Sequence, residues 1–163
     1  IHVMGLDFVR NMMTIGADKI ARQNLNGRIH LVQGDALCLP FTDCQFDVAG
    51  IAFGIRNIPD RMQALREMAR AVVPGGQIMV LEMHFPQIPW FKKIYERYLM
   101  KIIPGSARLL SKNPAAYNYL ADSIAHFPTP DAFAEMMKEA GLDKIETHSL
   151  SLGITYLHVG TRK

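Results

Sequence analysis

Residues 70–82 read Arg-Ala-Val-Val-Pro-Gly-Gly-Gln-Ile-Met-Val-Leu-Glu, and this stretch decides the fold class. A helix is predicted to end at one of the two valines before Pro74, because proline cannot continue it and the two glycines allow a sharp reversal. The apolar run 78–81 then predicts a strand buried on both faces, as in a parallel sheet covered by helices. Glu82 places a carboxylate at the end of that strand. The stretch predicts an α/β protein.

Composition agrees with a single domain over residues 1–163, since 49% of the residues are hydrophobic and 20% are charged. This balance is too apolar for a disordered chain and is typical of one globular core. No apolar run approaches the roughly 18 residues of a membrane-spanning helix. The two cysteines, Cys38 and Cys44, match no zinc-binding spacing, and they favour reduced thiols in a cytoplasmic protein.

Predicted strands alternate with predicted helices along the chain, which indicates a parallel sheet with helices on both faces. The last two strands are joined by a short turn and should pair antiparallel. The predicted strands are 1–6, 29–33, 46–53, 77–83, 144–150 and 154–160. The predicted helical segments are 9–24, 60–72, 88–127 and 129–141.

Asp7 ends the first predicted strand and directly precedes a helix. In sheets of this kind, an acid at the carboxyl end of the second strand accepts hydrogen bonds from a ribose diol. The alternative is that Asp7 caps a helix that begins at Phe8. Both roles are compatible with the local sequence.

Asp35 and Ala36 follow the next predicted strand. A carboxylate there can accept a hydrogen bond from the exocyclic amine of an adenine ring, and alanine leaves room for the ring. The alternative is that Asp35 only forms an Asx turn. These residues extend the predicted nucleoside site that begins at Asp7.

Several segments together resemble the C-methyltransferases of ubiquinone and menaquinone biosynthesis, which are class I S-adenosylmethionine-dependent methyltransferases. Phe-Gly-Ile-Arg-Asn at 53–57 is the most specific of them, and the resemblance covers the whole chain. The other segments are 34–41, 70–82, 117–124 and 127–128. The resemblance implies a Rossmann-like three-layer sandwich with an antiparallel strand near the C-terminus. It also implies S-adenosyl-L-methionine as cofactor and a quinol ring, of the demethylmenaquinol or ubiquinol-precursor type, as methyl acceptor.

The chain departs from this family pattern at three positions. Ala52 and His84 stand where the family commonly has serine, and Val73 stands where it commonly has lysine. With Asp7, Asp35 and Ala36, Ala52 is expected to border the cofactor. The departures leave two alternatives open: a methyltransferase acting on another small apolar acceptor, and a non-catalytic relative that binds partners.

The family's first strand and Gly-rich loop have no counterpart before Asp7, where only six residues stand. In the usual strand order of this class, the first strand lies at the centre of the sheet, and its loss would leave unpaired backbone groups in the core. The chain is therefore expected to be a fragment of a longer protein.

Arg56 and Asn57 are the predicted catalytic residues. Arg56 follows a strand on the ligand-binding side, where its guanidinium can stabilise a developing phenolate, and Asn57 can orient a hydroxyl. The alternative for Arg56 is a surface ion pair with Asp60. The reaction needs no metal, and no metal-ligand spacing is present.

Aromatic residues are the predicted walls of the acceptor pocket, with membership of the core as the alternative. Three histidines are candidate proton acceptors by residue type, and nothing ranks them above structural histidines. The predicted wall residues are Phe53, Tyr117 and Tyr119, and the histidines are His84, His126 and His158.

Basic and aromatic residues gather between positions 88 and 112, within a helical insertion expected over about 86–127. An amphipathic helix of this composition suggests contact with an anionic membrane surface, at its inner face for a cytoplasmic protein. The alternative is a lid that buries its apolar stripe over the substrate pocket or in a homodimer. Nucleic acid is disfavoured by a net charge of only +3 and the absence of a recognition motif. The basic residues are Lys92, Lys93, Arg97, Lys101, Arg108 and Lys112.

Overall fold

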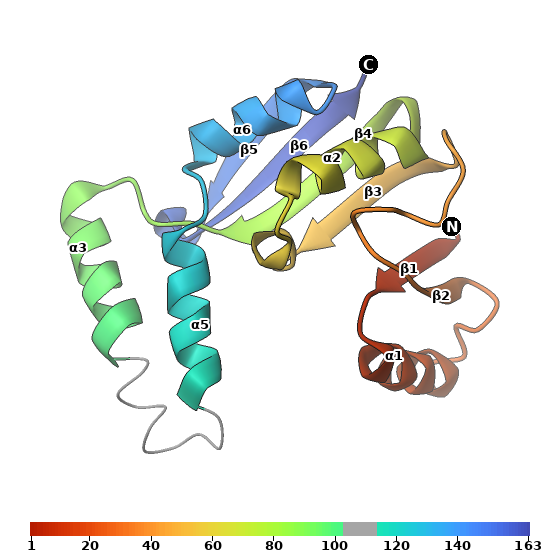
Figure 1. Cartoon of the computed structure of the whole chain (residues 1–163), viewed down its shortest axis with the longest axis horizontal. Helices are drawn as coiled ribbons and strands as arrows, with labels where there is room; N and C mark the ends of the chain where they lie inside the picture. The colour runs from red at the N-terminus through yellow and green to blue at the C-terminus, as the bar shows by residue number, and fades with distance from the viewer. Residues whose placement is uncertain (103–113) are drawn as a thin grey trace.

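The computed structural model describes residues 1–102 and 114–163 and contains two sheets (Figure 1). The smaller sheet pairs β1 (Val3–Asp7) with β2 (Ile29–Gln33) in parallel. The larger sheet has the order β3-β4-β6-β5. Its strands are β3 (Phe46–Ala52), β4 (Val72–Met83), β5 (Leu142–Leu150) and β6 (Thr155–Arg162).

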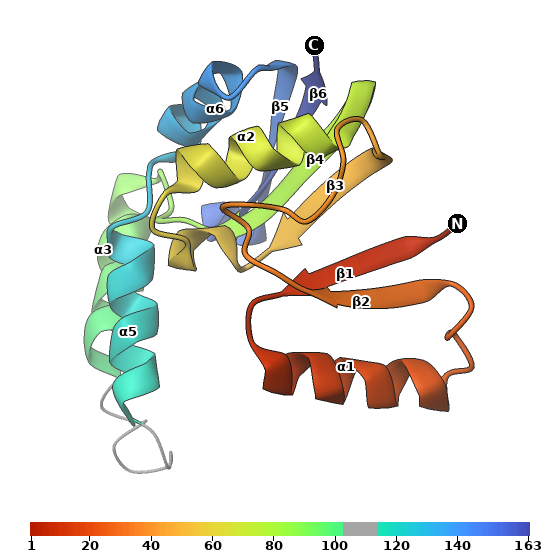
Figure 2. The ribbon, with the colours of Figure 1, turned by 45° about the vertical axis from the view of Figure 1, so that its right-hand side comes forward.

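Strand directions confirm the predicted α/β architecture. β3 and β4 are parallel, and β6 runs antiparallel to both β4 and β5. Figure 2 shows β1 beside β3, with the arrowheads of both strands pointing to the same side. Among the described residues, however, no ladder of hydrogen bonds joins β1 to β3. The parallel strands therefore form two sheets, where their alternation with helices predicted one.

The helices keep the predicted order, with ends that differ by a few residues. α2 and α6 pack on the larger sheet and contact each other, whereas α1 packs on the smaller sheet (Figure 1). Thr129 and Asp60 are N-caps, accepting hydrogen bonds from Ala132 and Gln63 respectively. The helices are α1 (Arg10–Arg22), α2 (Arg61–Ala71), α3 (Pro89–Arg97), α5 (Pro114–Ala125) and α6 (Pro130–Glu139).

The Pro-Gly-Gly segment lies inside β4, and the prediction that the strand begins at position 77 is wrong. Val72 already pairs with Phe46, and a register shift absorbs the residues before Gln77 resumes the ladder opposite Val48. Gly75 has a φ of 81°, and a Cβ on Gly76 would lie only 2.5 Å from the carbonyl oxygen of Asp47. The glycines thus allow a bulge with close backbone contact, where a simple helix-to-strand turn was predicted.

Two apolar clusters stabilise the larger sheet and the helices beside it. The main cluster lies between the larger sheet and its covering helices and includes Leu65, Ile78 and Phe133. The second joins Tyr95 of α3 and Leu99, just after it, to Ala121 and Ile124 of α5, so the described helices of the insertion pack against each other. Since fully burying such a side chain contributes about 1.5–3 kcal/mol, both clusters are strongly stabilising.

The helical region predicted over 88–127 is present as α3, one turn of π-helix named η2 (Tyr98–Ile102), and α5. Its middle part, 103–113, with the predicted basic residues Arg108 and Lys112, lies outside the described residues. None of the described helices has the length and apolar character that crossing a membrane requires.

Candidate functional site

Five predicted site residues follow the carboxyl ends of parallel strands. Asp7 ends β1, Asp35 and Ala36 lie just after β2, Ala52 ends β3, and Phe53 follows it. Ligands of open α/β sheets bind at this edge, because the loops after the strands diverge there. The topology thus brings the predicted cofactor and acceptor residues to one edge of the two sheets (Figure 2).

The carboxylate of Asp7 fixes the turn between β1 and α1. Its Oδ1 accepts a hydrogen bond from the backbone N–H of Val9 at 2.8 Å. The helix begins at Arg10 with Val9 as N-cap, so the alternative of a capped helix starting at Phe8 is wrong. Within the described residues, Oδ2 of Asp7 accepts no hydrogen bond, which leaves it available to a ligand hydroxyl.

Asp35 forms the Asx turn that was the alternative for this residue. Its Oδ1 accepts from the backbone N–H of Leu37 at 2.9 Å, and its carbonyl accepts from the N–H of Cys38 at 3.1 Å. The side chain is exposed and Ala36 is half-buried. In the part of the chain that the structure describes, Oδ2 of Asp35 has no partner, so the turn does not exclude ligand binding.

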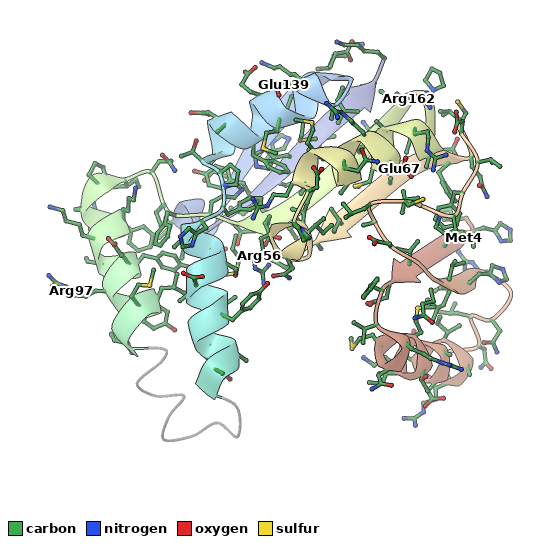
Figure 3. The ribbon with its side chains drawn as sticks, viewed as in Figure 1. Met4, Arg56, Glu67, Arg97, Glu139 and Arg162 are labelled. Carbon is green, nitrogen blue, oxygen red and sulfur yellow. The ribbon has the colours of Figure 1, made fainter. Side chains whose placement is uncertain are left out.

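The loop that carries Asp35 is held in place by α2. Glu67 accepts the backbone N–H of Leu39 at 2.8 Å, and Arg70 donates to the carbonyls of Leu39 and Phe41 at 3.0 and 2.8 Å. Glu67 and Arg70 also form an ion pair of 2.8 Å (Glu67 is labelled in Figure 3). The two sheets are not joined by paired strands within the described residues. These side-chain contacts instead fix the loop to α2, which packs on the larger sheet.

Arg56 lies in a single 3-10 turn, η1 (Ile55–Asn57), and is bound by the buried carboxylate of Glu82. Its Nη1 donates to Glu82 Oε1 at 2.5 Å and to the carbonyl of Phe53 at 2.8 Å. The alternative pairing with Asp60 is wrong, because Asp60 caps α2. Within the described residues, Nε of Arg56 is buried without a partner, and Nη2 makes no hydrogen bond, so Nη2 keeps its donor capacity.

Glu82 is a site residue that the sequence interpretation missed. The 26 positions that separate it from Arg56 hide the contact, which forms only when β3 and β4 pair. The available signal was a carboxylate closing an apolar strand, because a buried acid needs a charged or hydrogen-bonding partner. Glu82 is 0% exposed, so that partner is obligatory.

Asn57 and Tyr119 lie together, because the Tyr119 hydroxyl donates to Asn57 Oδ1 at 3.0 Å. This bond joins η1 to α5. Tyr117 and Tyr119 are 40% and 58% exposed, so the alternative that these residues belong to the core is wrong. Ala52 and Phe53 are exposed as well. The structure thus groups Phe53, Arg56, Asn57 and Tyr119 after the carboxyl end of β3, whereas Asp7 and Asp35 lie at the carboxyl ends of β1 and β2.

His84, which follows the carboxyl end of β4, and His158 in β6 form a buried chain of hydrogen bonds. His84 Nδ1 donates to the carbonyl of Pro128 at 3.0 Å, and its Nε2 therefore accepts from His158 Nε2 at 3.3 Å. His158 Nδ1 then accepts from the Thr147 hydroxyl at 3.2 Å. Burial lowers the pKa of each ring to about 4, so both are neutral at pH 7. They are structural, whereas His126 is exposed.

The buried pair predicts a loss of stability in mild acid. A histidine with a folded pKa of about 4 and an ordinary value of 6.5 stabilises the fold fully above pH 6.5, and this contribution is lost as the pH falls toward 4. The free energy of unfolding should fall by about 2 kcal/mol for each such histidine between pH 7 and pH 5. Urea unfolding at both pH values measures it. His126→Gln should keep this dependence, and a pH-independent stability would contradict it.

The chain is similar over nearly its whole length to known methyltransferase sequences. The model of the ubiE/COQ5 methyltransferase family matches residues 1–162. A demethylmenaquinone methyltransferase of Halalkalibacterium halodurans is 41% identical over 162 residues, which are 99% of this chain and 66% of that protein. The ubiquinone/menaquinone biosynthesis C-methyltransferase UbiE of Francisella philomiragia is 37% identical over 154 residues, 94% of this chain and 62% of that protein.

A solved structure supports the fold independently of these sequences. The SAM-dependent methyltransferase of Aquifex aeolicus superposes with a TM-score of 0.70 at 11% identity, covering 99% of this chain and 69% of that one. At this identity the likeness concerns the fold alone. It confirms the predicted Rossmann-like class I methyltransferase fold.

Proposed function

Because the chain belongs to the ubiE/COQ5 methyltransferase family, we propose that the protein containing it is an S-adenosylmethionine-dependent C-methyltransferase of a quinol ring. The acceptor is of the demethylmenaquinol or ubiquinol-precursor type. The observation that carries the proposal is the 41% identity to a demethylmenaquinone methyltransferase over 99% of the chain. The chain spans 66% of that relative's length.

The residues after β1 and β2 fit the nucleoside half of S-adenosylmethionine. Asp7 and Asp35 each engage one carboxylate oxygen in a local turn, and the second oxygen of each accepts no hydrogen bond within the described residues. Such oxygens suit the donors of a ribose diol and an exocyclic amine. Ala36, next to Asp35, and Ala52, at the end of β3, carry only methyl groups, which leaves room for the ligand.

The residues after β3 suit an ionised aromatic acceptor. When bound, S-adenosylmethionine supplies an electrophilic methyl carbon on a sulfonium. Arg56 directs its remaining donors to the quinol oxygen and stabilises the negative charge that activates the ring carbon. Asn57, held by Tyr119, orients a ring hydroxyl, and Phe53 and Tyr117 pack against the ring.

Calorimetry with S-adenosylhomocysteine tests the first requirement of this function. The complete protein should bind this product with a single site per chain, and Asp35→Ala should weaken the affinity, because it removes the acceptor for the adenine amine. Absence of binding by the complete protein would favour a non-catalytic, partner-binding relative. Binding without methylation of any quinol would favour a different small apolar acceptor.

The exposed side of α3 supports peripheral contact with an anionic membrane. Tyr95 and Leu99 face the core, whereas an apolar strip on the opposite side of the helix, with one residue per turn, is solvent-exposed. Lys93 and Arg97 are exposed beside them, so the surface is both apolar and basic. A groove of about 460 Å³ between this strip and Ile154 is almost wholly apolar. The exposed strip consists of Trp90, Ile94, Tyr98 and Ile102.

Neutralising the two basic residues should weaken binding to lipid. Each contributes about 1 kcal/mol near an anionic surface, so Lys93→Gln with Arg97→Gln should weaken vesicle affinity by about 2 kcal/mol at low salt. Flotation with phosphatidylglycerol-containing vesicles measures this on the complete protein. The matched control, Lys144→Gln with Lys163→Gln, removes the same charge elsewhere and should bind nearly as wild type.

Two results would contradict membrane contact. If the wild type fails to float at low salt, the surface does not bind lipid. If Trp90→Ala and Tyr98→Ala lower turnover of a short-chain, water-soluble quinol, then the strip belongs to a lid over the pocket. A concentration-dependent mass in solution, abolished by the same variants, would instead assign the strip to a homodimer.

A further inference from the structure

Phe53 has a strained backbone at the proposed acceptor site. Its φ is 54°, in the left-handed region that bulky residues rarely adopt. Such a conformation costs about 1–3 kcal/mol and persists only where the surroundings enforce it. The ring is 45% exposed, so burial of the side chain does not account for the strain.

Two hydrogen bonds hold the backbone of Phe53. Its N–H donates to the carbonyl of Leu81 at 2.8 Å, which continues the pairing of β3 with β4. Its carbonyl accepts from Arg56 Nη1 at 2.8 Å. The second bond comes from a side chain three residues further along, so the conformation of Phe53 depends on where the guanidinium of Arg56 is held.

Glu82 determines the position of Arg56. Oε1 accepts from Arg56 Nη1 at 2.5 Å and from the N–H of Met83 at 2.9 Å, and Oε2 accepts from the backbone N–H of Arg56 at 3.2 Å. The carboxylate thus contacts both the side chain and the backbone of Arg56. Since Glu82 is 0% exposed, it has no direct access to a ligand.

The geometry points to Glu82 as a positioning residue that acts through Arg56 to present the ring of Phe53 to the aromatic acceptor. This inference rests on the proposed function and deepens it, because it names what determines acceptor affinity. The chain of contacts runs from Glu82 to the Arg56 guanidinium, and from there to the Phe53 carbonyl. The ring then lies at the carboxyl end of β3, beside the donors of Arg56, where an aromatic ring can pack against it.

Phe53→Gly and Phe53→Ala separate the strain from the ring. Both remove the ring and should weaken acceptor affinity about tenfold, with S-adenosylhomocysteine affinity unchanged. Only glycine also relieves the strain, so its melting temperature should exceed that of the alanine variant by about 2–4 °C for each kcal/mol relieved. Calorimetry of the complete protein with short-chain demethylmenaquinone, besides its steady-state KM, gives the acceptor affinity.

A double-mutant cycle then tests the positioning by Glu82. Glu82→Gln should weaken acceptor affinity about tenfold in the Phe53 protein, and clearly less in the Phe53→Gly protein, where only the contact of Arg56 with the quinol oxygen remains to be disturbed. Glu135→Gln is the control, because Glu135 is also a carboxylate in an ion pair, with Lys138 at 2.6 Å, on α6, which carries no residue of the candidate site. It should leave acceptor affinity unchanged.

The inference is overturned if Phe53→Gly keeps wild-type acceptor affinity, or if Glu82→Gln weakens that affinity equally in both backgrounds. If Glu82→Gln fails to fold, the glycine and alanine variants of Phe53 still test the inference. Wild-type acceptor affinity in these variants would contradict a role of the ring in binding. Equal melting temperatures of the two variants would contradict the strain at Phe53. If the wild-type protein binds demethylmenaquinone but transfers no methyl group, only the proposed function is contradicted. The double-mutant cycle measures binding by calorimetry and needs no turnover.

Discussion

Replacing Arg56 by alanine should lower kcat for methyl transfer to the quinol by about 10²- to 10³-fold, the usual cost of removing a donor to a developing oxyanion. Affinity for S-adenosylhomocysteine should stay nearly unchanged, because Arg56 lies at the end of β3, apart from Asp7 and Asp35. Arg56→Lys keeps the charge but loses the planar fork that contacts Glu82 and Phe53 together, so it should recover only part of the rate.

Removing Arg56 also leaves the buried Glu82 charge without its partner, which typically costs about 3–5 kcal/mol of stability. The rate must therefore be measured well below the melting temperature of each variant. Arg56→Ala in combination with Glu82→Gln removes the orphaned charge, and it should remain slow while becoming more stable than Arg56→Ala. Wild-type kcat in the folded alanine and lysine variants would eliminate Arg56 from the chemistry and leave it a structural role.

Asp7→Ala should weaken S-adenosylmethionine binding by about 1.5–3 kcal/mol, the contribution of a hydrogen bond to a charged group. This corresponds to about a 10- to 150-fold rise in Kd. The reason is that Oδ2 of Asp7 accepts no hydrogen bond within the described residues, whereas Oδ1 is engaged by Val9. Calorimetry on the complete protein measures the change.

Asp60→Ala is the matched control for Asp7→Ala. Asp60 also accepts a backbone N–H, from Gln63, but as the N-cap of α2. Its loss should cost about 1 kcal/mol of stability and leave cofactor affinity unchanged. If Asp7→Ala behaves like this control, with lower stability and the same Kd, then Asp7 only fixes its turn.

The strands and most helices could be predicted because their signals are local. The apolar segment Ile29–Gln33 forms a strand with the predicted ends, and Thr129-Pro130 begins a helix as its capping chemistry requires. The start of β4 was predicted wrongly at position 77, because Pro74 was expected to lie outside the strand. A register shift instead accommodates the bulge without interrupting the strand. A local pattern predicts that proline breaks regular structure, and only the neighbouring strand shows how the break is absorbed.

The candidate site was predictable in position but not in its contacts. Asp7 and Asp35 lie at strand ends, as predicted, and ligands of such sheets bind at that edge. The partner of Arg56 could not be predicted, because Glu82 reaches it only through the pairing of distant strands. The burial of residues in and just after α3 could not be predicted for the same reason. The sequence predicted one apolar stripe, but contact with α5 buries Tyr95 and leaves Tyr98 exposed.

The position of the transferred methyl group distinguishes a C-methyltransferase from an O-methyltransferase. The complete protein should be incubated with isotopically labelled S-adenosylmethionine and reduced demethylmenaquinone, and the product examined by NMR. A labelled methyl group should appear on a ring carbon, and Arg56→Ala should strongly slow its formation. A label on a quinol oxygen, or no label on the quinol although the cofactor binds, would contradict the proposed C-methyltransferase.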